Sequence, residues 1–105
     1  MPVHYAPRTP AFRIVSSEEL SRIPDPAGIA VVSLGQRPEA QGVPVAHEFC
    51  LESPAAASRL LYETLHRCDA LGVRTIVVVM PPDRPEWQAV RDRLLRATRP
   101  LAERS

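Results

Sequence analysis

Two runs of β-branched and other apolar residues most constrain the fold of this chain. They cover Gly28–Leu34 (GIAVVSL) and Arg74–Met80 (RTIVVVM). Continuous apolar runs of this length are typical of strands that are covered on both faces, as in parallel α/β sheets. A helix is predicted between them, because Ser53 and Pro54 form an N-cap and N1 pair and Gly72 suits the left-handed residue after a helix. The two runs are therefore expected to be central strands of a layered α/β sheet.

The helix predicted after Ser53 carries its apolar residues on one face. They recur at steps of three and four residues: Ala57, Leu60, Leu61, Leu65, Cys68 and Leu71. A stripe with this spacing usually faces the core of a domain. Leu61 and Leu65 are therefore expected to pack against the strands Ile29–Leu34 and Thr75–Met80.

Shorter patterns add further elements. Phe12–Val15 alternates like a short strand, and serines followed by two glutamates over 16–19 predict a short helix next. The side chains of Val45–Leu51 alternate as in a strand that has one face partly exposed to solvent. A last helix is expected from near Pro85, and Pro100 is expected to end or kink it. The predicted apolar stripe of this helix comprises Trp87, Val90, Leu94, Ala97 and Leu101.

The order strand, helix, strand, strand, helix, strand, helix indicates the fold class. Alternation of this kind favours an α/β domain. We predict a small Rossmann-like three-layer domain with a mainly parallel sheet of about four strands. The loop over 35–44 is short for a parallel crossover, which usually needs a dozen or more residues, so the order of the strands stays open.

The composition fits one folded domain. The chain has 105 residues, of which 45% are hydrophobic and 24% are charged, which is enough for a core that folds without a cofactor. A net charge of +1 argues against strong direct nucleic-acid binding. No apolar run approaches the length of a membrane span and no signal peptide is recognised, so we expect no membrane partner and a cytoplasmic location.

Cysteine and histidine do not form a recognisable reactive site. Cys50 and Cys68 stand among apolar neighbours, where a free cysteine usually packs as a small hydrophobic residue. His4, His47 and His66 show none of the spacings that are typical of metal ligands. The sequence therefore predicts no metal site and no cysteine nucleophile.

Polar loop residues are the candidates for a ligand site. In α/β domains, ligands bind outside the carboxyl ends of the strands, where Gln36, Arg37, Asp83 and Arg84 are expected to lie. These four residues could hold an anion, although polar residues in solvated loops are the commoner interpretation. No glycine-rich phosphate loop follows Leu34.

Arginines on the last helix are candidates for a docking surface. Arg93 and Arg96 share one face of the predicted helix. They could contact an anionic partner, or they could form a solvated face that suits the negative end of the helix dipole.

Three segments of the chain resemble one protein family. Prolines are expected to keep the N-terminal arm extended. The arm carries His-Tyr-Ala-Pro at His4–Pro7. This motif resembles the linker of two-domain L-threonylcarbamoyladenylate synthases of the Sua-five type. Arg59–Asp69 and Ala89–Ala97 are similar to helices of that family's C-terminal accessory domain. The resemblance implies an extended linker or lid arm over 1–11 and a Rossmann-like accessory domain over 12–105. Nothing in the chain matches the larger YrdC-like catalytic domain.

The resemblance implies a role in tRNA modification. Enzymes of this family combine threonine, bicarbonate and ATP into threonylcarbamoyl-AMP and pyrophosphate, and the product is used to modify adenosine 37 of certain tRNAs. Their linker lies across the catalytic cleft and helps to close it, which implies that His4, Tyr5, Ala6 and Pro7 are lid residues. The resemblance also implies no catalysis by this chain alone, no cofactor bound to it, a YrdC-like catalytic domain as its partner in cis or in trans, and ATP with magnesium in that domain.

Two other functions fit fewer features. A sensor that binds a nucleotide or an amino acid through Gln36, Arg37 and Asp83 is the main alternative. A free-standing hydrolase or transferase would need a nucleophile, a base and an orienting group together, and the sequence does not offer them. The family usually has glycines before the last helix, whereas this chain has Pro85–Gln88, which argues for hydrophobic docking around Trp87 instead of a ligand site there.

Overall fold

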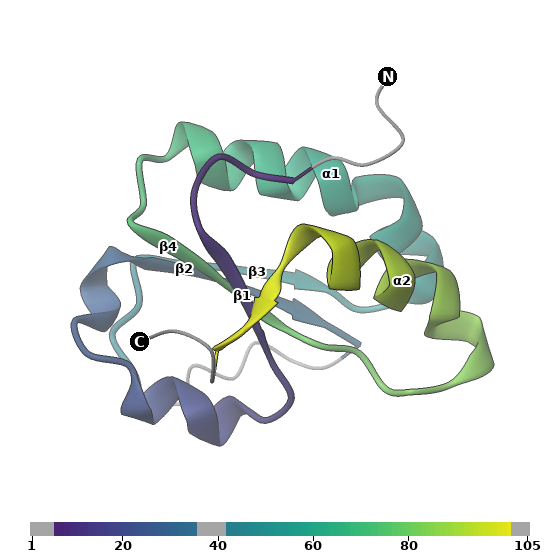
Figure 1. Ribbon diagram of the computed structural model, residues 1–105, viewed down its shortest axis with the longest axis horizontal. Coiled ribbons are helices and arrows are strands. Elements are labelled where there is room, and N and C mark those ends of the chain that lie inside the picture. The colour runs from purple at the N-terminus through teal and green to yellow at the C-terminus, as the bar shows by residue number, and fades with distance from the viewer. Residues whose placement is uncertain (1–5, 36–41, 102–105) are drawn as a thin grey trace.

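A computed structural model describes residues 6–35 and 42–101 of the chain (Figure 1). Within them, five parallel strands form one sheet in the order β3-β2-β4-β1-β5. The strands are β1 (Ala11–Ile14), β2 (Ile29–Leu34), β3 (His47–Leu51), β4 (Thr75–Val79) and β5 (Arg99–Pro100). The helices are α1 (Pro54–Ala70) and α2 (Gln88–Ala97), with the short 3-10 helices η1 (Ser17–Arg22), η2 (Pro26–Gly28) and η3 (Pro85–Trp87). No helix in the described part is both long enough and apolar enough to span a membrane.

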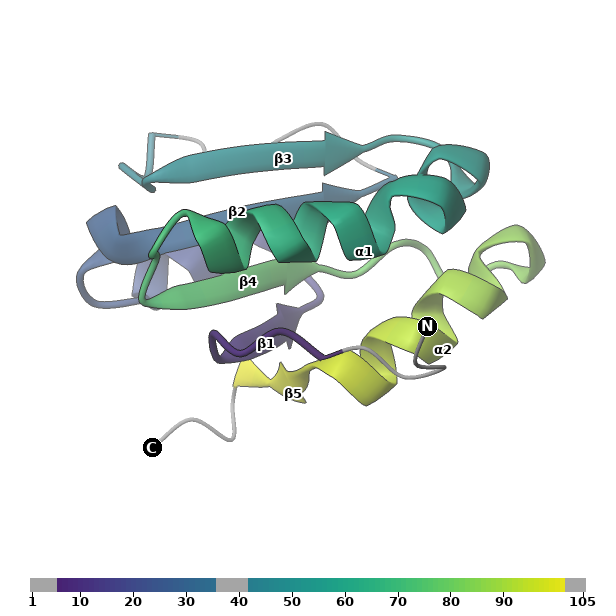
Figure 2. The same cartoon turned by 90° about the horizontal axis from the view of Figure 1, so that it is seen from above.

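The sheet is covered on both faces, which makes three layers. α1 and α2 lie on one face and η1 lies on the other (Figures 1 and 2). The larger core cluster joins α1 and α2 to strand residues such as Val32 and Val78, whereas the smaller cluster joins Leu20 of η1 to Val31 and Val77. Neighbouring strand residues thus point into opposite layers. This arrangement confirms the predicted three-layer α/β fold.

β2 and β4 are the central strands, as their apolar runs predict. Every residue of both strands is buried. They pair in parallel, from Ile29 beside Thr75 to Ser33 beside Val79. A strand that is covered on both faces has no wet side on which polar residues could alternate. Its signature in the sequence is therefore a continuous apolar run.

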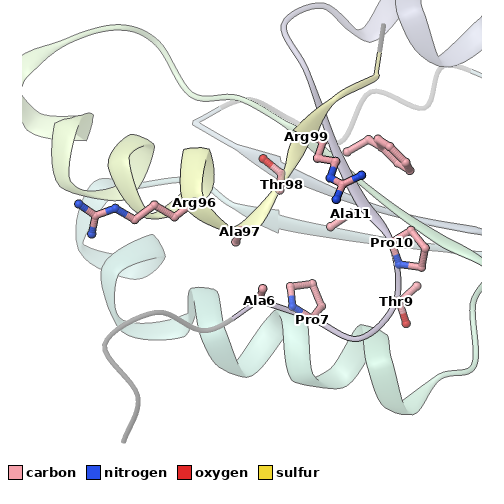
Figure 3. A pocket seen from close by; sticks show the side chains of 10 residues that line it. Ala6, Pro7, Thr9, Pro10, Ala11, Arg96, Ala97, Thr98 and Arg99 are labelled. Atoms are coloured by element: carbon pink, nitrogen blue, oxygen red, sulfur yellow. The ribbon is translucent and has the colours of Figure 1, made fainter. Parts of the chain in front are cut away.

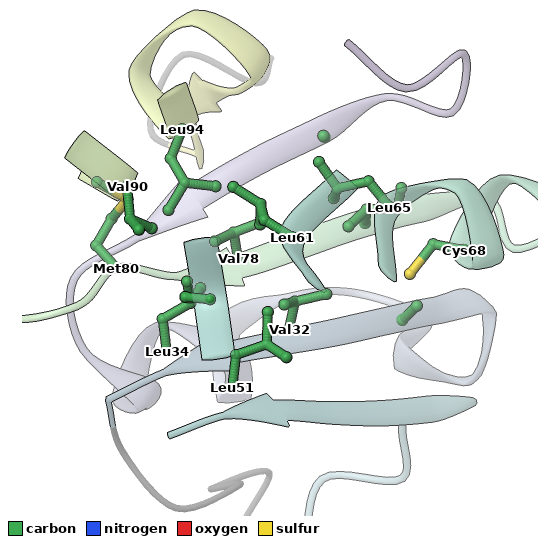
Figure 4. Packing of buried hydrophobic residues seen from close by; sticks show 14 of the residues in the cluster. Val32, Leu34, Leu51, Leu61, Leu65, Cys68, Val78, Met80, Val90 and Leu94 are labelled. Atoms are coloured by element: carbon green, nitrogen blue, oxygen red, sulfur yellow. The ribbon is translucent and has the colours of Figure 1, made fainter. Parts of the chain in front are cut away.

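α1 begins and ends where its capping residues predict. The Oγ atom of Ser53 accepts the N–H of Ala56 at 3.0 Å, and Gly72 follows the helix with a φ of +73°. Leu61 and Leu65 are 1% and 0% exposed and pack in the larger cluster (Figure 4). The expected packing of this helix on the central strands is confirmed.

β2 and β3 are parallel neighbours, although the connection over 35–46 is short. In its described part, Val43 and Val45 pack against the smaller cluster. The N–H of Ala46 also donates to the carbonyl of Ile29 at 2.9 Å. These residues cover part of the face on which a crossover helix would otherwise lie.

The two ends of the domain differ from the sequence prediction. The first helix, η1, is a 3-10 helix, although Ser16 is its N-cap and Glu18 and Glu19 lie in its first turn, as expected. α2 stops at Ala97, and the following residues form β5, a fifth strand that pairs with β1. Leu101 packs in the smaller cluster, so its prediction as part of the α2 stripe is wrong. Pro100 explains the change, because the residue before a proline is held extended and an edge strand tolerates its missing N–H.

Candidate functional site

One side chain anchors the N-terminal arm to the end of α1. Asp69, in the last turn of α1, accepts the N–H of Arg8 through Oδ2 at 3.1 Å and the N–H of Thr9 through Oδ1 at 2.9 Å. The carbonyl of Pro10 accepts the N–H of Ile76 at 2.9 Å. Three successive arm residues are therefore fixed to the domain before β1 begins.

A pocket of about 430 Å³ lies between the arm and the end of α2 (Figure 3). Ala6 and Pro7 line it from the arm, and Ala97, Thr98 and Arg99 line it from the other side. Its walls are mostly small or apolar side chains. Ala6 and Pro7, the described part of the His-Tyr-Ala-Pro motif, thus border a cavity and do not belong to the core.

A second cavity lies at the carboxyl ends of β1 and β4. These two strands are neighbours, but β1 leads to η1 on one face of the sheet and β4 leads to α2 on the other. Where the chain leaves two neighbouring strands toward opposite faces of the sheet, a crevice forms, and α/β domains commonly bind ligands in such a crevice. The cavity measures about 550 Å³, and Val15 and Leu95, which are 80% and 50% exposed, line it.

The charged residues that line this crevice already form hydrogen bonds with other groups of the domain. Each of the four has a hydrogen-bond partner: Arg13 with Thr98, Glu19 with Val15 and Ser16, Asp83 with Gln88, and Arg91 with Pro81. The bond from Arg91 to the carbonyl of Pro81 is 2.7 Å long, and the Asp83 carboxylate also lies 3.8 Å from the Arg91 guanidinium. An anionic ligand would have to compete with these contacts.

The structure does not bring the predicted site residues together. Four of them lie outside the described residues: His4, Tyr5, Gln36 and Arg37. Ala6 and Pro7 lie at the pocket near the amino end of β1, whereas Asp83 lines the crevice at the carboxyl end of β4. Arg84 is exposed before η3 and is not part of that crevice. Ala6 and Pro7 and the described ligand candidates therefore lie toward opposite ends of the parallel strands.

Trp87 belongs to the core and not to a docking surface. Its side chain is 4% exposed and is part of the larger cluster. Gly35, with a φ of +74°, gives it space, since an added Cβ there would lie 3.0 Å from Cζ2 of the Trp87 ring. The expectation that Trp87 docks onto another domain is therefore wrong, and the ring instead continues the buried stripe of α2.

Arg93 and Arg96 have different surroundings. The guanidinium of Arg93 lies 5.9 Å from the centroid of the Tyr62 ring and donates to the carbonyl of Ser58 at 3.4 Å, so it links α2 to α1. Arg96 pairs with Asp92 at 3.4 Å on the exposed surface of α2. It also lines the pocket beside the arm, although its guanidinium points away from Ala6 and Pro7 (Figure 3). Arg96 remains a candidate for docking, whereas the contacts of Arg93 serve packing within the domain.

The two thiols are not activated as nucleophiles. Burial raises the pKa of the Cys68 thiol to about 11, and the carboxylate of Asp69 adds to the rise. Burial also raises the pKa of the Cys50 thiol, with a contribution from Glu52. Because the thiolate is the reactive form, these shifts lower the reactivity of both groups at neutral pH. Within the described ranges, no three His, Cys, Asp or Glu residues gather as a metal site.

The anchoring role of Asp69 is not predicted from the sequence. Its position offered one signal, because an acid in the last turn of a helix faces the negative end of the helix dipole. Arg67 in the same turn suits that position and Asp69 does not. Its partners are 61 and 60 residues away in the chain, so only the fold reveals them.

Comparison with known proteins identifies the family. Searches of curated proteins and of solved structures return no match. The family model described as the C-terminal domain of threonylcarbamoyl-AMP synthase matches residues 1–98, which include the arm, β1 to β4 and both α-helices. The chain therefore belongs to the family of threonylcarbamoyl-AMP synthase C-terminal domains.

Proposed function

We propose that this chain is the accessory domain of a threonylcarbamoyl-AMP synthase that acts beside a YrdC-like catalytic domain, in cis or in trans. The catalytic domain binds ATP with magnesium and forms threonylcarbamoyl-AMP and pyrophosphate from threonine, bicarbonate and ATP. The product serves the modification of adenosine 37 in tRNA. The arm closes over the catalytic cleft, with His4–Pro7 as the lid, so this chain contributes positioning instead of chemistry.

The family match over residues 1–98 is the observation that carries this proposal, because it includes the arm that bears the lid motif. The anchor at Arg8 and Thr9 supports it, since the arm leaves the domain from a fixed point. The exposure of Ala6 also supports it, because a lid residue must be available to a partner.

A pyrophosphate-release assay tests whether this chain positions substrates while the catalytic domain carries out the reaction. The assay supplies threonine, bicarbonate, ATP and magnesium to three samples: this chain alone, the catalytic domain alone, and the two joined. We expect no release above a blank from this chain, and a higher kcat/KM for the joined protein than for the catalytic domain alone, because lid closure positions substrates and excludes water. Release by the pure chain, or equal rates with and without it, would contradict the proposal.

The crevice at the carboxyl ends of β1 and β4 favours a second candidate function, a small-molecule sensor. Its location is the usual ligand site of α/β domains, and Asp83 lines it together with Arg91. The internal hydrogen bonds of its charged residues weigh against tight binding of an anion. The accessory function is therefore the better supported of the two.

Fluorescence titration separates the sensor from the accessory domain. Trp87 is the single tryptophan of the chain, and its ring and Pro82, which lines the crevice, both lie against Gly35. We expect ATP, AMP and threonine to cause no saturable change in its emission below about 1 mM. Saturation in the micromolar range that Arg91→Ala abolishes would establish the sensor instead.

A further inference from the structure

Asp69 fixes the arm through two neighbouring backbone groups. Its two carboxylate oxygens take the N–H groups of Arg8 and Thr9, one each, at 3.1 and 2.9 Å. The next residue, Pro10, is bound to Ile76 at the start of β4. Residues from Pro7 toward the N-terminus precede this anchor. The anchor thus holds the arm at Arg8 and Thr9, and Ala6, which precedes it, is exposed.

The helix alone does not explain an acid at this position. A carboxylate in the last turn of α1 faces unpaired carbonyl groups and the negative end of the helix dipole. The two backbone donors of the arm offset this repulsion, because a hydrogen bond to a charged acceptor is stronger than one between neutral groups. The position of Asp69 is therefore accounted for by the arm that it holds.

We propose that Asp69 is a positioning residue for the lid, because it sets the point from which His4–Pro7 reach the catalytic cleft. This inference rests on the proposed function of the chain. The four residues from His4 to Pro7 span at most about 14 Å when extended, so the reach of so short a segment depends on where it is held. Without the hydrogen bonds to Asp69, Pro10 becomes the first arm residue that the domain holds. The free segment is then longer, which lowers the fraction of time in which the lid is closed.

Asp69→Asn, in the protein that contains both domains, breaks the anchor with little change in size. Asparagine has one acceptor oxygen, and its NH₂ group would face a backbone donor. Glu63→Gln is the matched control, because it makes the same carboxylate-to-amide change at an exposed position of the same helix. Neither change removes buried apolar surface, so both variants are expected to fold.

Amide hydrogen exchange measured by NMR tests the anchor itself. We expect the amides of Arg8 and Thr9 to exchange about tenfold faster or more in Asp69→Asn, as for the loss of a hydrogen bond to a charged group. The amide of Ile76 should keep its rate in this variant, and all three amides should keep theirs in Glu63→Gln. Unchanged exchange at Arg8 and Thr9 in Asp69→Asn would overturn the anchor.

Steady-state pyrophosphate release tests the positioning role. We expect Asp69→Asn to lower kcat/KM for threonine about threefold to tenfold, whereas Glu63→Gln keeps the wild-type value. Asp69→Glu, which keeps two acceptor oxygens, should recover part of the rate. The His4→Ala, Tyr5→Ala double variant is measured beside it. If that double variant is impaired while Asp69→Asn keeps full activity, the inference is overturned and the proposed lid stands. Full activity of that double variant would instead overturn the proposed function.

Discussion

Replacing Leu65 by alanine is expected to lower the free energy of unfolding by roughly 2–5 kcal/mol. Leu65 is fully buried in α1, in the same cluster as Val32 of β2 and Val78 of β4 (Figure 4). The substitution removes buried methyl groups and leaves a cavity that a close-packed interior refills only in part. Urea denaturation followed by circular dichroism measures the loss.

Leu95→Ala is the matched control for this substitution. Leu95 lies on α2 and is 50% exposed, so its truncation should cost about 1 kcal/mol or less. Equal losses for Leu65→Ala and Leu95→Ala would mean that α1 does not pack on the sheet. The three-layer fold would then be wrong.

The central part of the fold could be predicted because its signals are local. The apolar runs that become β2 and β4 are buried on both faces, so burial appears directly as a continuous stretch of β-branched residues. The limits of α1 follow from Ser53 and Gly72, whose side chain and backbone conformation act within one turn of the helix. The order of the strands could not be predicted, because it depends on which face each crossover takes.

The ends of the domain were harder to predict for a physical reason. β5 has two residues, too few to show a period, and the proline that ends α2 also forms part of this strand. Edge strands accept a proline because its missing N–H faces away from the sheet. The switch from helix to strand after Ala97 therefore depends on pairing with β1 as well as on Pro100.

The candidate site was predictable only in part. His4–Pro7 were found as a motif, whereas the anchor at Asp69 depends on contacts between distant parts of the chain. Trp87 belongs to an apolar stripe that the sequence shows, and its burial follows from that stripe. The docking interpretation relied instead on the departure from the family's glycines, which says nothing about exposure.

Replacing both His4 and Tyr5 by alanine is expected to lower turnover about tenfold to a hundredfold in the protein that contains the catalytic domain. The proposed function assigns these two residues to the lid. The anchor at Asp69 holds Arg8 and Thr9, so the substitutions do not alter the residues that hold the arm. A lid without these side chains positions the substrates less well, and the loss should appear in kcat as well as in kcat/KM.

The rate of pyrophosphate release by this double variant is the most direct test of the account, because the central claim is that the arm works as a lid. His47→Ala is the control, since His47 is exposed on β3 at the edge of the sheet farthest from β5. We expect the double variant to lose turnover while His47→Ala keeps it, with equal midpoints of thermal unfolding. A double variant that releases pyrophosphate as fast as the wild type would contradict the account, and the arm would then be only a tether between the two domains.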